Sequence, residues 1–258
     1  MLMFNLTVVI LTKNEQDNIV EVINNVKKCA DDILVVDSFS TDNTIRLAKA
    51  NGARVVCREL DNDFSEQRNF ALTQTQAKWI LYVDADERLS DELINNIKSI
   101  VVTNEDKQCI IKRKSVAFGQ EFNYGVLRAD FVVRLFPRAS VKWINKVHEQ
   151  PLCSLPKKKL AGYIKHYTYN NWDQYFNKFN QYTSIWAQNA HERNKKSSIV
   201  AAFFHASADF FQMLVIQKGF LDGKLGFVLS LNHFFYVWVK YIKLRQLRAE
   251  QLNRKKKN

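Results

Sequence analysis

The chain has 258 residues, of which 47% are hydrophobic and 25% are charged. These values are close to those of average soluble globular proteins, so they exclude a disordered or collagen-like chain. Four cysteines in a chain of this length are too few for a disulfide scaffold, which favours a reducing compartment. They show no CxxC spacing, which counts against a structural zinc site.

Charge is distributed unevenly along the chain. Residues 1–110 hold 12 basic and 18 acidic side chains, a net charge of −6, whereas residues 111–258 hold 26 basic and 8 acidic ones, a net charge of +18. A basic half of this kind indicates an anionic partner, such as nucleic acid, a membrane surface or a phosphorylated substrate. A basic surface that only meets solvent is the alternative.

In chain order, the first 118 residues alternate apolar strands with helical patterns. The pattern predicts strand 6–11, helix 15–28, strand 33–36, helix 41–51, strand 54–60, helix 65–76, strand 79–83, helix 90–102 and strand 109–118. The apolar N-terminus has no basic region before it, so it fits a first strand better than a signal peptide. This alternation implies an α/β fold with a mostly parallel sheet and helices on both faces.

Ligands of such sheets bind at the carboxyl ends of the strands. The polar groups at those ends lie at 12–15, 37–42, 61–63 and 84–87, so we expect them to converge on one crevice.

From about Tyr163 the pattern becomes helical and rich in Phe, Tyr and Trp. We therefore predict an α/β domain at 1–162 and a basic helical region at 163–258. The segments 199–216 and 225–241 come closest to membrane spans, but polar residues interrupt both (His205, Asp209, Asn232 and His233). We expect buried or interfacial helices there. The closing basic run 254–257 suits either an anionic leaflet or a frayed helix end.

The clearest chemical signal is the pair Asp84 and Asp86, which follows the predicted strand in WILYVDAD. Two carboxylates on a strand-end turn can share one divalent cation and leave positions open for diphosphate oxygens. Arg68 lies just upstream and can pair with phosphate as a planar fork. The alternatives are a solvated acidic turn and a surface arginine paired with Asp61 or Asp63.

Three segments resemble family 2 inverting glycosyltransferases of the GT-A fold: VVILTKNEQDNI, DDILVVDSFSTDNT and FSEQRNFALTQTQAKWILYVDADE. The resemblance continues through LFPR, VHE, HYTY, GFLDGKLGF and KYIKLRQ, and so covers nearly the whole chain. Within the family these motifs are most similar to bacterial lipopolysaccharide inner-core glucosyltransferases, whose acceptor is a heptose. The resemblance implies a Rossmann-like GT-A domain at 1–162 that binds the nucleotide sugar and carries out catalysis, followed by the helical region at 163–258 that faces the acceptor or a membrane. It also implies a UDP-sugar donor and a divalent cation, Mg²⁺ or Mn²⁺.

The resemblance also assigns roles to residues. It places the nucleotide sugar on Thr12, Asn14, Glu15, Asp37, Ser38, Arg68 and Asp84, and the cation on Asp84, Asp86 and His166. One departure concerns the base: Ser38 stands where the family usually has the second residue of an Asp-Asp pair. Either Asp37 or the Ser38 hydroxyl would then contact the uracil.

An inverting transfer needs a carboxylate that deprotonates the acceptor hydroxyl. The candidates after the DxD motif are Glu149, Asp130 and Glu121, and VHE favours Glu149 with Asp130 as the second choice. An ion pair with Lys146 or Lys142 is the structural alternative for Glu149. His148 is interpreted as structural or acceptor-lining, and Trp143 as either a sugar-stacking or a core residue.

The expected partners are a UDP-sugar, a lipopolysaccharide core acceptor and an anionic membrane surface, with no nucleic acid. The expected location is cytoplasmic, peripheral on the inner face of the bacterial inner membrane. Another acceptor, a polysaccharide or polyprenyl phosphate, is the nearest alternative, although a polyprenyl-phosphate enzyme would often add spanning helices. A DxD phosphatase and a basic binding module are the alternatives from other classes. Arg88 departs from the phosphatase motif, which has Thr or Val there.

Overall fold

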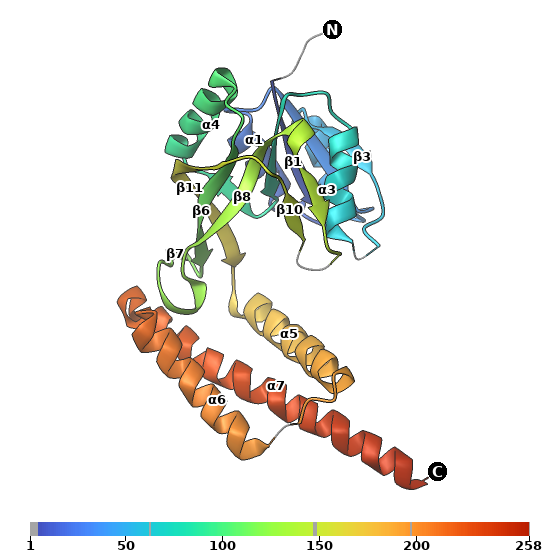
Figure 1. Cartoon of the computed structure of the whole chain (residues 1–258), viewed down its shortest axis with the longest axis vertical. Coiled ribbons are helices and arrows are strands. Elements are labelled where there is room, and N and C mark those ends of the chain that lie inside the picture. Colours follow the sequence, from blue (N-terminus) through green and yellow to red (C-terminus); the bar gives the residue numbers. More distant parts are fainter. Residues whose placement is uncertain (1–4, 62, 147–148, 197, 258) are drawn as a thin grey trace. The chain divides into compact units, whose positions relative to one another are not determined.

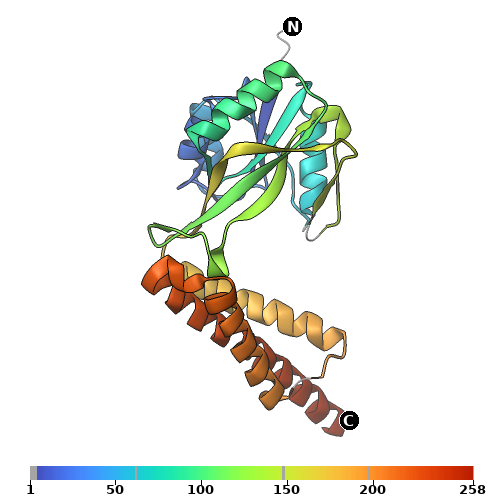
Figure 2. The same ribbon diagram turned by 60° about the vertical axis from the view of Figure 1, so that its left-hand side comes forward.

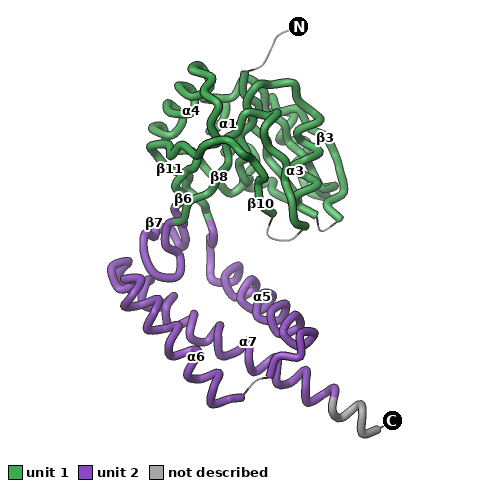
Figure 3. Tube along the Cα trace, viewed as in Figure 1, with its two compact units in different colours: residues 1–113, 130–167 green, residues 114–129, 168–258 purple. Residues whose placement is uncertain are grey.

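The computed structural model describes residues 5–61, 63–146, 149–196 and 198–257, with side chains up to Gln251. The chain forms two compact units, coloured separately in Figure 3. Unit 1 comprises residues 1–113 and 130–167, and unit 2 comprises residues 114–129 and 168–258.

The first half of unit 1 is a parallel sheet. Its strands run in the order β3-β2-β1-β4, with bounds Arg54–Cys57, Asp32–Asp37, Leu6–Thr12 and Trp79–Asp84. Continuous apolar stretches such as LTVVIL are typical of strands covered on both faces. Because the strands run in parallel, Thr12, Asp37 and Asp84 end at the same edge, as predicted.

The sheet continues beyond β4 with antiparallel strands, so it is mixed. β8 (Asp130–Pro137) pairs antiparallel with both β4 and β6 (Gln108–Ala117). β11 (Lys157–Tyr169) lies next to β6 and pairs antiparallel with β5 (Glu87–Leu89). The short strands β9 (Lys142–Ile144) and β10 (Gln150–Leu152) form a separate hairpin after the 3₁₀ turn η2 (Arg138–Ser140).

Four helices cover the two faces of the sheet. They are α1 (Ile19–Val26), α2 (Thr44–Ala50), α3 (Phe64–Thr73) and α4 (Asp91–Thr103). Val8 and Ile10 of β1 belong to a core with α1 and α4, whereas Val9 belongs to a second core with Ala71 of α3. Alternate β1 side chains thus bury on opposite faces, which confirms an α/β fold with helices on both sides (Figure 1).

Unit 2 is mainly helical. It contains α5 (Trp172–Glu192), α6 (Ile199–Phe211) continued by the π-turn η3 (Gln212–Ile216), the 3₁₀ turn η4 (Gly219–Asp222) and α7 (Gly223–Lys257). It also holds β7 (Gln120–Glu121) and the 3₁₀ turn η1 (Gly125–Leu127). The predicted boundary at 162/163 lies within β11, and the structure separates the units after Tyr167 instead. Strand pairing explains the difference, since β11 is held by β5 up to His166.

The sequence predicts that the apolar helices of unit 2 are either buried or interfacial, and the structure does not bury them. Two segments, Ile199–Ile216 and Gly219–Gln251, are long and apolar enough to cross a membrane by length and composition. Only 11% of the first window and 22% of the second are buried within the protein. The prediction of buried core helices is therefore wrong for most of their surface, and the prediction of interfacial helices stays open.

Candidate active site

The carboxyl ends of β1 and β2 are joined by hydrogen bonds around Asp37. The Thr12 hydroxyl donates to Asp37 Oδ2 over 2.8 Å, the Ser40 hydroxyl donates to the same oxygen over 2.6 Å, and the Ser40 amide donates to Oδ1 over 2.7 Å. Asp37 is fully buried and does not line the cavity described below, whereas Thr12 and Ser38 do. Asp37 therefore shapes this loop, and a direct uridine contact stays a prediction.

Two further predicted nucleotide residues, Asn14 and Glu15, lie on the loop after β1. Asn14 has a left-handed backbone (φ 56°), and its side-chain oxygen accepts from the Thr41 amide over 2.8 Å. The Glu15 amide donates to the Thr44 hydroxyl, and its carboxylate accepts from the Asn18 amide group. Of the two, Glu15 lines the cavity.

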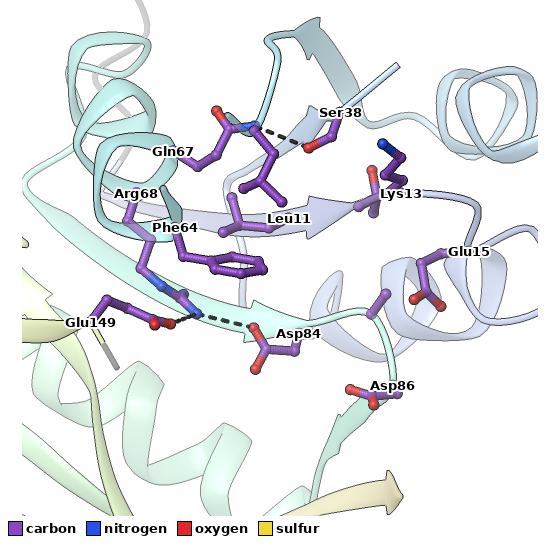
Figure 4. Close-up of a pocket in the computed structure, with 13 residues that line it drawn as sticks. Leu11, Lys13, Glu15, Ser38, Phe64, Gln67, Arg68, Asp84, Asp86 and Glu149 are labelled. Carbon is purple, nitrogen blue, oxygen red and sulfur yellow. Dashed lines mark hydrogen bonds and ion pairs between the residues drawn. The ribbon is translucent and has the colours of Figure 1, made fainter. Parts of the chain in front are cut away.

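Ser38, the position that departs from the family pattern, is held by a glutamine of α3. Gln67 Nε2 donates to the Ser38 hydroxyl over 3.0 Å and to the Arg58 carbonyl over 2.9 Å (Figure 4). Because the hydroxyl accepts this bond, its own proton is directed elsewhere. A serine here offers the cavity a donor where a carboxylate would offer an acceptor.

Asp84 ends β4 between two arginines. Arg134 of β8 approaches Asp84 Oδ2 to 2.7 Å, and Arg68 of α3 approaches Oδ1 at 3.4 Å. Burial opposes ionisation of Asp84, but the charges of Arg134 and Arg68 outweigh it and hold the pKa of this carboxyl below its ordinary value. The first aspartate of the DxD motif is therefore a charged, firmly oriented acceptor.

Glu87 anchors the turn that carries the motif. Its carboxylate is fully buried, accepts the Asp84 amide over 3.0 Å and lies 3.5 Å from Arg113 and 3.7 Å from Arg134. Burial and the nearby Asp84 charge raise the pKa of Glu87, although Arg134 opposes them. The Glu87 carboxylate thus stabilises the Asp84–Glu87 turn from its buried side.

Asp86 and His166 come together across the paired strands β5 and β11. His166 Nε2 lies 3.2 Å from Asp86 Oδ2, and the Tyr167 amide donates to the Asp86 carbonyl. Burial lowers the pKa of His166, but the hydrogen bond and charge of Asp86 outweigh it, so the net shift is upward. The two residues to which the resemblance assigns the cation therefore lie next to each other, and their role as ligands stays a prediction.

A divalent cation fits this pair only with help from its substrate. Among the described residues, no group of three or more histidine, cysteine, aspartate or glutamate side chains is arranged to hold a metal ion. Asp84 is engaged by Arg134 and Arg68, which leaves Asp86 and His166 as two donors. Diphosphate oxygens and water would then complete the coordination.

Arg68 links the DxD motif to the predicted base. Its guanidinium lies 3.3 Å from Glu149 Oε1 and 3.4 Å from Asp84 Oδ1, which Figure 4 shows as two dashed contacts on one nitrogen. The guanidinium packs on the rings of Tyr82 and Trp143, at 5.3 and 4.7 Å from their centroids. Arg68 is thus a buried site residue, and the surface alternative is wrong: Asp63 instead caps α3 at the Glu66 amide.

The three candidate bases differ in their surroundings. Glu149 lines the cavity and pairs with Arg68. Asp130 makes a two-pronged pair with Arg113, at 3.0 and 2.7 Å, and is not a lining residue. Glu121 belongs to unit 2, where it pairs with Lys114.

Two neighbouring predictions have different outcomes. Trp143 is buried and packs against Tyr82 and Phe136, so it is a core residue rather than an open sugar platform. Val147 and His148 lie outside the described residues.

These groups surround one cavity of about 510 Å³ in unit 1. Polar side chains stand along it from the ends of β1, β2 and β4 and from α3, and apolar side chains complete the wall. Its lining residues are Leu11, Thr12, Lys13, Glu15, Ser38, Leu60, Phe64, Gln67, Arg68, Asp84, Ala85, Asp86 and Glu149. Of the residues that we predicted for the site, Asn14, Asp37, Asp130 and His166 do not line it.

Sequence reasoning missed Arg134 and Gln67, and it placed Glu87 in the crevice with the rest of 84–87 rather than buried beneath the turn. Arg134 gave a usable signal, because an arginine inside the apolar stretch FVVRLF must find a carboxylate when its strand is buried. Glu87 and Gln67 gave none, because their roles depend on the pairing of β5 with β11 and on the packing of α3.

Comparison with known proteins gives consistent matches. The family model "Glycosyl transferase family 2" matches residues 7–161. An uncharacterized glycosyltransferase of Rickettsia felis is 30% identical over 259 residues, covering 95% of this chain and 90% of that protein. One of Rickettsia typhi is 29% identical, covering 95% and 88%. The glycosyltransferase SunS of Bacillus subtilis is 29% identical over 147 residues, covering 55% and 34%.

Among solved structures, the chain resembles glucosyl-3-phosphoglycerate synthase from Mycobacterium tuberculosis in complex with Mn²⁺ and UDP. The identity is 26%, the coverage is 45% of each chain, and the TM-score is 0.36. The family match spans most of unit 1, including the β1, β2 and β4 ends, Arg68 and Glu149. This chain is a glycosyltransferase and belongs to glycosyl transferase family 2.

Proposed function

We propose that the protein is an inverting, metal-assisted transferase that moves glucose from UDP-glucose onto a heptose of a lipopolysaccharide inner core. Family membership rules out the alternatives of a DxD phosphatase and a basic binding module. The observation that carries the proposal is the convergence of Asp84, Arg68 and Glu149 on one cavity that Asp86 also lines. The choice of donor and acceptor rests on the motif resemblance along the chain.

The donor would lie along the carboxyl edge of β1, β2 and β4. Thr12, Glu15 and Ser38 line the half of the cavity suited to the nucleoside, and Arg68 offers the diphosphate a cation. A divalent cation held by Asp86 and His166 would neutralise charge on the leaving diphosphate.

Glu149 would act as the general base. Its carboxylate takes the proton of the acceptor hydroxyl as that oxygen forms a bond to the anomeric carbon. The bond from this carbon to the diphosphate breaks on the opposite side, and UDP leaves. Arg68 orients Glu149 at 3.3 Å while also contacting Asp84, so one side chain relates the base to the DxD motif.

The polyprenyl-phosphate acceptor stays the second candidate. We counted the lack of spanning helices against it, yet two helices of unit 2 are long and apolar enough to cross a membrane. Both acceptors are carried by membranes. The net charge of +18 over residues 111–258 supports a peripheral position on the anionic inner face of the inner membrane.

Product analysis tests this proposal. The enzyme would be incubated with UDP-glucose and Mg²⁺ or Mn²⁺, with either heptose-terminated lipopolysaccharide core or polyprenyl phosphate. We expect glucose on the heptose, with a β anomeric proton in the NMR spectrum. An α-linked product would contradict the inverting mechanism, and transfer to polyprenyl phosphate alone would contradict the acceptor.

A further inference from the structure

The α6 helix of unit 2 exposes its large apolar side chains and buries its small ones. Val200, Phe204 and Phe211 are 63%, 67% and 56% exposed, whereas Ala202 and Ala206 are buried. Helices of soluble proteins bury the apolar face and expose the polar one. Here small residues allow the approach to α7, and the bulky apolar residues face outward.

The adjoining part of α7 shows the same pattern. Phe227, Leu231 and Phe235 are between 39% and 48% exposed. α6 and α7 lie side by side in both views of Figures 1 and 2. Rings meet across their seam, with Phe203 at 5.8 Å from Phe234 and Phe210 at 6.4 Å from Phe227. The exposed residues of the two helices thus form one surface, which we call the α6–α7 apolar face.

Basic residues border this face at both of its ends. Lys218 and Lys224 flank the turn between the helices, Lys195 and Lys196 precede α6, and the exposed Arg245 follows the apolar part of α7. Asp209 is the one acidic residue within α6, and it faces His233 at 3.9 Å. An apolar face with cationic borders matches the boundary between lipid tails and anionic headgroups. A second copy of the chain would place basic borders against each other.

The contacts of these helices within unit 2 oppose a spanning arrangement. α7 packs along α5, whose exposed side chains include Asp173, Gln174 and Asn177, so lipid cannot surround α7. The turn between α6 and α7 is tied to residues 114–129: the Asp222 carboxylate accepts the Asn123 and Tyr124 amides, at 3.2 and 2.9 Å.

A close backbone contact strengthens this tie. A Cβ at Gly125 would lie 2.9 Å from the Cα of Gly219, and the Gly125 amide donates to the Gln217 carbonyl over 2.9 Å. Residues 113 and 130, on either side of this segment, belong to unit 1. Carrying the turn across a bilayer would therefore require moving a segment that is continuous with the catalytic unit.

We infer that the α6–α7 apolar face inserts into the headgroup–acyl boundary of the bilayer leaflet that it contacts, with both helices in the plane of the membrane. The apolar side chains reach the acyl chains, and the lysines at both ends contact headgroup phosphates. This deepens the membrane position proposed above, because apolar insertion rather than charge holds the protein there. It does not depend on which sugar or acceptor the enzyme uses.

The test is binding of the full-length protein to sedimented vesicles of neutral lipid or of 30% anionic lipid, at low salt and in 1 M NaCl. Phe204→Gln with Phe211→Gln removes two exposed rings of the face. Val102→Gln with Phe131→Gln is the matched control, since these residues of unit 1 are 83% and 52% exposed. Lys195→Gln with Lys196→Gln tests the charged border.

We expect the wild type and the control to stay bound in 1 M NaCl, where charge attraction acts over only about 3 Å. The Phe double variant should lose about tenfold or more of that salt-resistant binding. The Lys double variant should lose only the preference for anionic lipid at low salt.

Complete release of the wild type by salt would overturn the inference, as would unchanged binding of the Phe variant. Protease protection of the 212–224 turn behind sealed vesicles would show a spanning hairpin and overturn it too. If the wild type were a dimer that did not bind vesicles, and the Phe double variant were a monomer, the face would instead bind a second copy of the chain. UDP release with a soluble acceptor should be the same in all variants, so the proposed reaction is tested separately.

Discussion

Glu149 and Asp130 illustrate how far residue types alone can identify a base. Both are acidic and follow the DxD motif, but only Glu149 lines the cavity, while Asp130 is held by two bonds to Arg113. The VHE resemblance favoured the residue that the structure places in the cavity. Nothing in the sequence showed that Arg68 would hold it, because the two are 81 positions apart.

Glu149→Gln should abolish most of the transfer rate and leave UDP binding intact. Glutamine keeps the shape and an acceptor oxygen toward Arg68 but cannot take a proton, and a general base contributes about 10²–10⁴-fold. Initial rates and a UDP titration would measure the two effects. Asp130→Asn is the matched control and should keep a rate close to wild type. Equal loss of UDP binding in Glu149→Gln would contradict its role as base.

Asp86→Ala should weaken UDP binding in the presence of Mg²⁺ or Mn²⁺ and have little effect in EDTA. The reason is that Asp86 and His166, 3.2 Å apart, are the two side chains that we propose hold the cation against the diphosphate. Calorimetric titration with each cation and with EDTA would measure this. His166→Ala should act in the same direction. A loss of equal size in EDTA would assign Asp86 to nucleotide contact or folding instead.

The strands and helices of the first 118 residues could be predicted well from periodicity. The predicted strands 6–11 and 79–83 correspond to β1 and β4, and the helix 90–102 corresponds to α4. The antiparallel strands β8 and β11 could not be found this way. Their side chains contain charges such as Arg134 and Lys165 whose burial depends on partners distant in sequence.

Strand β8 contributes to the site mainly through Arg134. Arg134→Met should destabilise the fold by about 3–5 kcal/mol, because it leaves the buried carboxylate of Glu87 and the partly buried carboxylate of Asp84 without their shared cation. Urea unfolding would measure the change, with exposed Arg46→Met as the control. In an Asp84→Asn background the same substitution should cost less. An equal cost in both backgrounds would show that packing, not the ion pair, accounts for the effect.

At the scale of the whole molecule, residues 1–110 carry a net charge of −6 and residues 111–258 a net charge of +18. The charge split predicted an anionic partner for residues 111–258. It did not predict that α6 and α7 would expose their apolar side chains, because hydropathy alone does not distinguish a core helix from one that faces lipid. Burial in the folded chain makes that distinction.

An enzyme held at a membrane by the α6–α7 apolar face, as we infer, should prefer an acceptor in the same membrane. We expect kcat/KM for heptose-terminated lipopolysaccharide in anionic vesicles to exceed that for the delipidated core by about tenfold or more, since shared localisation raises effective concentration. Phe204→Gln with Phe211→Gln should remove that advantage without changing turnover of the delipidated core. A wild-type enzyme that showed no preference would contradict a catalytic use of the membrane.

The most direct test of the central claim is UDP release from a panel of UDP-sugars. The wild-type protein would be assayed with Mg²⁺ or Mn²⁺ and with EDTA, each with and without heptose-terminated core. The account predicts release from UDP-glucose that requires both the cation and the acceptor. Undiminished release in EDTA would contradict the role given to Asp86 and His166. If no UDP-sugar released UDP and UDP binding did not depend on the cation, the assignment of the cavity to a UDP-sugar would be contradicted.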